Sequence, residues 1–146
     1  MGLNRVVFSV DIEADKSIIW SALWNRYTEW ASVFMDGSYA VTDDWKEGSK
    51  VKFLDPEHNG IYSIIEGHIP NELMRFKHVG SVSKGEEQAP DDETETWTGA
   101  SEAYSITEGK NNNTLTIEID VLDEHLEFMK DKLPKALEKV KLMAME

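Results

Sequence analysis

Apolar and polar residues alternate near the start of the chain. Every second position from Val6 to Ile12 is apolar, and most of the positions between them are polar. Because successive side chains of a β-strand point to opposite faces, this spacing predicts a strand with one buried face. Asp15 then occupies the place of a helix N-cap ahead of the apolar-rich segment 16–24, which predicts a short helix. A second short helical segment is expected to follow and to carry Trp30.

The middle of the chain changes to short strands separated by turn residues. Turns are indicated by Gly48, by residues 56–60, by Pro70 and by residues 109–113. Segment 81–94 is rich in aspartate and glutamate, and it is expected to be an exposed, mobile loop. Six strands are expected, at residues 38–44, 49–55, 60–69, 73–80, 95–107 and 114–121.

The last segment has the period of an amphipathic helix. Its apolar residues recur at three- and four-residue steps and form one stripe. Pro134 interrupts the stripe, because a proline inside a helix removes a hydrogen bond and clashes with the preceding turn. Either the helix kinks there, or a short helix ends near Lys132 and the main helix begins with Pro134 in its first turn. The stripe consists of Leu126, Met129, Leu133, Ala136, Leu137, Val140 and Ala144.

This order of elements predicts an α+β fold. One strand and two short helices precede six strands, and a long helix closes the chain. Strands that follow one another through short turns form an antiparallel sheet, and the long helix would cover its apolar face. Because 146 residues is the size of one ordinary domain, residues 1–146 are expected to form a single domain.

The composition limits the location and the partners of the protein. The chain has no cysteine, so it must fold on its hydrophobic core without disulfides. It has no apolar run of about 18 residues and no signal-peptide pattern, so a cytoplasmic location without membrane association is expected. Twenty-eight acidic residues against 15 basic ones leave a formal net charge of −13. Phosphate backbones repel such a surface, so no nucleic-acid partner is expected.

No common catalytic or metal-binding motif is present in the sequence. Gly80 and Gly85 have the spacing of a P-loop, but Glu86 and Glu87 follow where lysine and serine or threonine are required. The dinucleotide fingerprint, the nucleophile elbow and the H-E-x-x-H motif are all missing. The acidic segment 81–94 lacks the spaced ligands and the glycine of an EF-hand loop. We therefore expect no cofactor and no metal, and we assign no catalytic residue.

His78 is a polar residue on a strand face that is otherwise apolar. Lys77 must point to water, so His78 shares the buried face with Phe76. A buried imidazole needs a hydrogen-bonding partner, because an unpaired buried polar group costs about 1–3 kcal/mol. His78 is therefore either a core residue with a partner such as Tyr62 or Tyr104, or a contact for a bound ligand.

Glu102 poses a similar question on a later strand. It has the same parity as Tyr104, and a carboxylate on a buried face is costly without a partner. Two interpretations remain open. A bulge near Gly99 could turn Glu102 outward, or Glu102 could face a cavity.

Several segments of the chain resemble a known group of proteins in the same order. The group is the START-like (SRPBCC, Bet v-type) superfamily, and within it the homologues of the heat-shock-protein-90 ATPase activator. The resemblance covers nearly the whole chain, although each segment alone is mostly apolar spacing. The matching segments are 10–14 (VDIEA), 19–23 (IWSAL), Trp30, 44–53 (DWKEGSKVKF), 60–62 (GIY), 69–78 (IPNELMRFKH) and 134–140 (PKALEKV).

The resemblance implies a helix-grip fold, in which a curved antiparallel sheet wraps around the C-terminal helix and leaves a cavity between them. Two features depart from the family pattern. Leu133 stands where many relatives carry a tryptophan before the proline, which could enlarge the cavity. Segment 81–94 has no obvious counterpart and could cover the mouth of the cavity.

The leading functional hypothesis is a non-enzymatic cavity that binds a small hydrophobic or aromatic molecule. Trp30 and Trp97 are included in the site because each lies at the edge of an element beside a segment expected to move. The candidate ligand-binding residues are Trp30, Tyr62, Phe76, His78, Trp97, Tyr104, Met129 and Leu133.

Two other functions stay open at this point. The chain could be an interaction domain that regulates the heat-shock-protein-90 ATPase, with that chaperone as its partner. It could also be an enzyme of the cyclase or dehydratase type, with His78 or Glu102 as an acid–base group. The fold does not decide among them, because the superfamily supports many functions.

Overall fold

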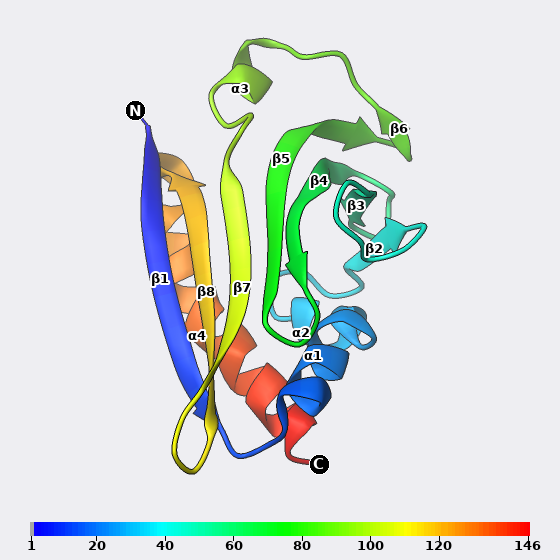
Figure 1. The fold of residues 1–146 in the computed structure, drawn as a ribbon. Helices are drawn as coiled ribbons and strands as arrows, with labels where there is room; N and C mark the ends of the chain where they lie inside the picture. Colours follow the sequence, from blue (N-terminus) through cyan, green and yellow to red (C-terminus); the bar gives the residue numbers. More distant parts are fainter. Residues whose placement is uncertain (1) are drawn as a thin grey trace.

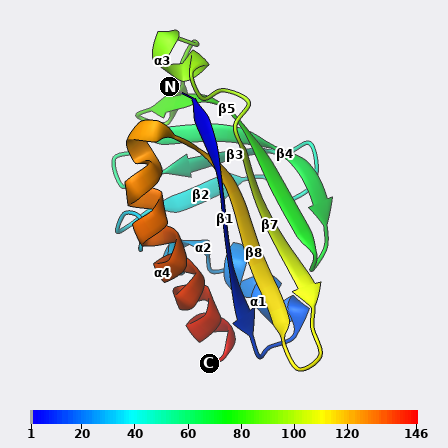
Figure 2. The same cartoon turned by 90° about the vertical axis from the view of Figure 1, so that its left-hand side faces the viewer.

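A curved antiparallel sheet and one long helix form the body of the protein. The structure is a computed structural model, and it describes residues 2–146. Seven strands follow the spatial order β1-β8-β7-β5-β4-β3-β2, and the short β6 pairs with β5 outside this order. Figure 1 shows helix α4 behind the β1–β8–β7 side of the sheet, and Figure 2 shows it lying along one face. This is the α+β helix-grip arrangement that the sequence predicts.

The elements have the following bounds. The strands are β1 (Leu3–Ile12), β2 (Tyr39–Thr42), β3 (Lys50–Leu54), β4 (Gly60–Ile69), β5 (Leu73–Ser83), β6 (Glu86–Glu87), β7 (Ser101–Glu108) and β8 (Asn113–Leu122). The helices are α1 (Lys16–Trp24), α2 (Tyr27–Ala31), α3 (Asp92–Glu95), a 3-10 turn η1 (Asp123–His125) and α4 (Leu126–Ala144).

The first strand forms as its alternation predicts. β1 pairs with β8 along its whole length, from Leu3 opposite Leu122 to Ile12 opposite Asn113. Val6 lies opposite Ile119, and both are buried in the core. Strands β1 and β8, which are far apart in sequence, therefore lie side by side at the edge of the sheet where α4 packs (Figure 2).

Helix α4 is one element that runs through Pro134. Of the two alternatives for this segment, the structure has the continuous helix and not a break near Lys132. The apolar stripe is buried from Leu133 onwards, whereas Leu126 and Met129 are only half-buried. The helix is therefore pressed against the core in its second half and leaves room beside its first two turns.

The expected strand at residues 95–107 is wrong in its first half, because β7 begins only at Ser101. Asp91 caps the short helix α3 instead, and its side chain accepts a hydrogen bond from the backbone N–H of Thr94 at 2.8 Å. A capped N-terminus with acidic residues in the first turn favours helix over strand. Thr94 is also buried, which anchors this turn to the rest of the protein.

Segment 81–94 is also more structured than expected. β5 continues to Ser83, and a two-residue turn at Lys84 and Gly85 leads into β6. Both turn residues have positive φ, at 52° and 84°, which is the backbone of the tight hairpin turns that favour glycine. Regular elements therefore cover much of the expected loop, whereas most of the segment is exposed as expected and its mobility stays a prediction.

The described residues include no helix that is long and apolar enough to cross a membrane.

The burial of α4 gives the first testable prediction. Leu137 is 2% exposed on the sheet-facing side, so Leu137→Ala should cost about 2–5 kcal/mol of unfolding free energy by leaving a cavity. Leu142 lies on the same helix but is 58% exposed, so Leu142→Ala should change stability by less than about 0.5 kcal/mol. Urea denaturation of both variants measures the difference. Equal losses would contradict the burial of this face.

Candidate functional site

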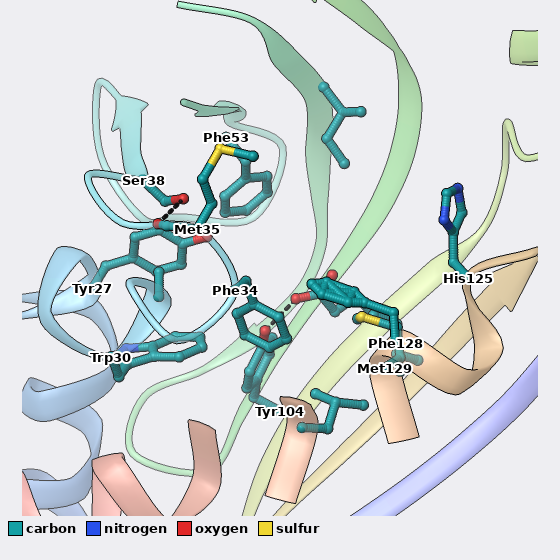
Figure 3. Close-up of a pocket in the computed structure, with 15 residues that line it drawn as sticks. Tyr27, Trp30, Phe34, Met35, Ser38, Phe53, Tyr104, His125, Phe128 and Met129 are labelled. Atoms are coloured by element: carbon teal, nitrogen blue, oxygen red, sulfur yellow. Dashed lines mark hydrogen bonds between the residues drawn. The ribbon is translucent and has the colours of Figure 1, made fainter. Parts of the chain in front are cut away.

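A cavity lies between the sheet, helix α2 and the first turns of α4. Its first lobe has a volume of about 370 Å³ and a mostly aromatic and aliphatic lining. Figure 3 shows Tyr27 and Trp30 on one side and His125, Phe128 and Met129 on the other. The remaining lining residues are Ala31, Phe34, Met35, Ser38, Phe53, Ile61, Glu102, Tyr104, Ile119 and Leu133.

A second lobe of about 460 Å³ adjoins the first. The two lobes share one stretch of wall, which we call the waist; it consists of Ile61, Glu102, Ile119, His125 and Met129. Beyond the waist the second lobe reaches the edge of the sheet and the α3 segment. Its other lining residues are Leu3, His78, Ser81, Glu93, Trp97, Ala100, Asp120, Val121 and Leu122. Each lobe is of the size that small-molecule sites have, about 300–1,000 Å³.

An irregularity in strand β5 decides which of its residues face the cavity. Ser63 of β4 lies opposite His78, but Tyr62 lies opposite Gly80, so Val79 is an extra residue in the ladder. Such a bulge reverses the side to which the following residues point. Ser81 therefore lines the second lobe.

Tyr62 lies on the face of β4 away from the cavity, because its neighbours Ile61 and Ser63 take the inner face. The ring of Tyr62 lies against Gly80, so closely that a Cβ there would stand 2.7 Å from it. The amino group of Lys50 lies 5.3 Å from the centre of the same ring. Tyr62 therefore lines neither lobe.

His78 is buried and hydrogen-bonded on both ring nitrogens. Its Nδ1 lies 2.6 Å from the hydroxyl oxygen of Ser63, and its Nε2 lies 3.2 Å from Oε1 of Glu102. The expected partners, Tyr62 and Tyr104, are not the observed ones, although Tyr104 joins the network through Glu102. The expectation that His78 takes the inward side of its strand agrees with its 6% exposure.

Glu102 faces the cavity, so the second of its two interpretations holds. Gly99 does have a positive φ of 88°, but this turn precedes β7 and does not rotate Glu102 outward. Glu102 accepts a hydrogen bond from the hydroxyl of Tyr104 on the same strand face. Its side chain is 19% exposed, and it belongs to the waist between the two lobes.

Two tyrosine hydroxyls near Glu102 stay protonated. Burial, and then the negative charge of Glu102, raise the pKa of Tyr104 well above its usual value. The same two causes raise the pKa of Tyr27, whose side chain lines the first lobe (Figure 3). Both residues therefore act as hydroxyl donors, and neither supplies a phenolate at neutral pH.

Apolar side chains form the rim of the first lobe. Met35 is 52% exposed and Phe128 is 40% exposed, although both line the lobe. His125, which is exposed, stands beside them at the start of α4 (Figure 3). Large exposed apolar residues at the opening of an apolar cavity are typical of a route for hydrophobic molecules.

The sequence-predicted site residues fall into three groups. Trp30, Tyr104 and Leu133 line the first lobe, and Met129 belongs to the waist. His78 and Trp97 line the second lobe. Tyr62 and Phe76 line neither lobe.

Phe76 packs behind two residues that line the first lobe, Phe53 and Tyr104. It is fully buried, and its ring lies 5.1 Å from Phe53 and 6.1 Å from Tyr104, in edge-to-face contacts. It therefore supports two residues of the first lobe without lining it.

Sequence reasoning missed the residues that come from loops and element ends. Tyr27, Phe34 and Met35 line the first lobe from α2 and the segment after it. Phe128 lies off the apolar stripe of α4, so periodicity does not select it, yet it lines the first lobe. The aromatic content of segment 27–35 was the available signal, but no regular spacing connected it to the sheet.

The described residues contain no group of three or more histidine and acidic side chains arranged to hold a metal ion.

Comparison with known proteins supports the fold and leaves the function open. The sequence matches no family model, and it matches no curated protein. Among solved structures, the Aha1 dimer from Colwellia psychrerythraea is 16% identical, with a TM-score of 0.67 over 94% of this chain and 93% of that one. Protein MLL2253 from Mesorhizobium loti is 14% identical, with a TM-score of 0.71 over 96% of both chains.

A third solved structure, Ara h 8.0201, is 8% identical and has a TM-score of 0.66 over 99% of both chains. At such low identities these similarities establish the fold alone. The resemblance to the START-like (SRPBCC, Bet v-type) superfamily is confirmed at that level, because its members are among the structural neighbours.

The Ser63–His78 pair gives a prediction about the cavity wall. His78→Phe and Ser63→Ala should each lower the unfolding free energy by about 1–3 kcal/mol, because each leaves a buried polar partner unpaired. The double variant should cost less than the sum, by a coupling of about 0.5–3 kcal/mol. Urea denaturation of the four proteins measures this coupling.

The control cycle replaces Ser63→Ala with Ser105→Ala. Ser105 lies on β7 opposite Leu73, five residues along β5 from His78, so its cycle with His78→Phe should be additive. Additivity in the Ser63 cycle as well would show that the hydrogen bond contributes nothing to stability.

Proposed function

We propose that the protein binds a small hydrophobic or aromatic molecule in the cavity between its sheet and helix α4, without catalysing a reaction. The observation that carries this proposal is the pair of adjoining lobes, whose walls are mostly apolar and carry a small number of polar side chains, Glu102 and His125 among them at the waist. Ligand sites have this composition, because apolar contact supplies affinity and a few fixed polar groups supply orientation.

The apolar rim supports the same function. Met35 and Phe128 are partly exposed to water at the opening of the first lobe. This exposed apolar surface is unfavourable in the free protein. A hydrophobic molecule that enters there would cover both side chains. The rim and the lobe behind it thus favour the same class of ligand.

The polar cluster favours binding over nucleophilic catalysis. Ser63 is fully buried and does not line either lobe, so its hydroxyl is not available to a substrate. In a serine nucleophile site the hydroxyl must reach the reacting atom. The hydrogen bonds of Ser63 and His78 instead fix the position of Glu102 at the waist.

A binding measurement with a cavity-filling variant tests the proposal. The probe is N-phenyl-1-naphthylamine, an uncharged dye whose fluorescence rises in apolar surroundings. Met129→Trp places a larger side chain at the waist, where both lobes meet, so the dissociation constant should rise at least about tenfold.

The matched control is Met145→Trp. Met145 is 46% exposed near the C-terminus and lines neither lobe, so the same substitution there should leave the dye affinity unchanged. Thermal melts confirm that both variants fold. The proposal would be overturned if the wild-type protein did not bind the dye, or if both variants bound it like the wild type.

A further inference from the structure

The carboxylate of Glu102 makes no ion pair with a lysine or an arginine in the part of the chain that the structure describes. Its observed partners are the hydroxyl of Tyr104 and the imidazole of His78. Among residues 2–146, neither lobe is lined by a lysine or an arginine. A carboxylate that is largely removed from water without a cation is costly. The cavity therefore holds a carboxylate that is hydrogen-bonded to Tyr104 and His78 and has no lysine or arginine in the lining around it.

The hydrogen bonds around His78 are complete with a neutral imidazole. The hydroxyl of Ser63 can donate to Nδ1, and Nε2–H can then donate to Glu102. In this arrangement His78 serves Glu102 as a donor through Nε2–H. Each carboxylate oxygen accepts more than one hydrogen bond, so Glu102 keeps acceptor capacity toward the cavity.

Two other acidic residues line the second lobe: Glu93, which is exposed, and Asp120, which is already paired. Asp120 accepts a hydrogen bond from Arg5 at 2.5 Å and another from the backbone N–H of Ser101 at 2.9 Å. Its pKa is lowered because the bonds to Arg5 and Ser101 outweigh the opposing effect of burial. The contrast with Asp120 leaves Glu102 as the carboxylate at the waist that has no lysine or arginine partner.

Aromatic rings stand on both sides of the waist. Tyr27 and Trp30 line the first lobe, and Trp97 lines the second. Aromatic faces attract cations and pack well against flat apolar groups. A molecule with a ring system and one positive charge would satisfy both the walls and the carboxylate.

We propose that the ligand of this cavity is an apolar or aromatic amine, whose protonated nitrogen pairs with Glu102 while its ring system occupies the first lobe. This inference rests on the proposed binding function and adds the charge of the ligand. The inference also argues against fatty acids and other organic anions as ligands, because their charge has the same sign as that of Glu102.

Three probes that share one ring system test the inference on the wild-type protein. They are 1-naphthylmethylamine, which is cationic at pH 7, 1-naphthalenemethanol, which is neutral, and 1-naphthoate, which is an anion. Calorimetric titration at about 0.15 M salt screens charges on the outer surface but not those inside the cavity. The amine should bind at least about tenfold more tightly than the naphthoate, with the alcohol between them.

Glu102→Gln removes the charge and keeps the shape of the side chain. In this variant the amine should lose at least about tenfold in affinity, and the order of amine and naphthoate should no longer hold. Glu108→Gln is the matched control, because Glu108 is an exposed acidic residue on the same strand. It should leave all three affinities unchanged, which excludes a general effect of net charge.

The outcomes distinguish this inference from the proposed function. If the naphthoate binds as tightly as the amine, the amine proposal is overturned while the cavity still binds apolar molecules. If none of the three probes binds, the amine proposal is again overturned, and the uncharged dye shows whether the binding function fails with it. Should Glu102→Gln not fold, the order of the three affinities on the wild-type protein still decides the question.

Discussion

The uneven burial of helix α4 is the constraint on which the rest of the structure depends. From Leu133 to Ala144 its apolar stripe is sealed against the sheet, and this contact supplies the core. Its first two turns, with Met129 half-buried and Phe128 exposed, do not reach the sheet in the same way. The space beside these turns is the first lobe, whose sheet side is lined by residues of β3, β4, β7 and β8. Stability and binding thus use different halves of one helix.

Polar groups in the cavity wall are held by the sheet itself. The Val79 bulge keeps His78 on the inner face next to Ser63 and turns the following residues over. Glu102 comes to the same place from β7, where it lies opposite Phe76 of β5 and Ile119 of β8. These positions are fixed by backbone pairing, so the carboxylate is presented to the cavity without the entropy cost of a mobile loop. The site is preorganised for a ligand that can use that acceptor.

Regular periodicity allowed the fold to be predicted from sequence, and local irregularity limited the prediction of the site. The alternation from Val6 to Ile12 and the stripe of α4 repeat over many residues, so they identify elements and faces reliably. The helix capped by Asp91 and the turn after it occupy residues 92–100, where the sequence predicts the end of a loop and the start of a strand, because a single capping residue gives no periodic signal. Likewise, the extra residue at Val79 has no signal in the sequence, yet it decides that Ser81 faces the second lobe.

Methionine methyl groups report directly on whether the cavity is the binding site. Met129 lies at the waist and Met35 at the rim, whereas Met143 is buried in the core and Met145 is exposed near the C-terminus. The most direct test is the NMR spectrum of protein with 13C-labelled methionine methyls, titrated with an uncharged naphthalene probe. We expect the signals of Met129 and Met35 to shift with the probe while those of Met143 and Met145 stay in place. Shifts confined to Met145, or none at Met129 under saturating probe, would contradict the cavity as the binding site.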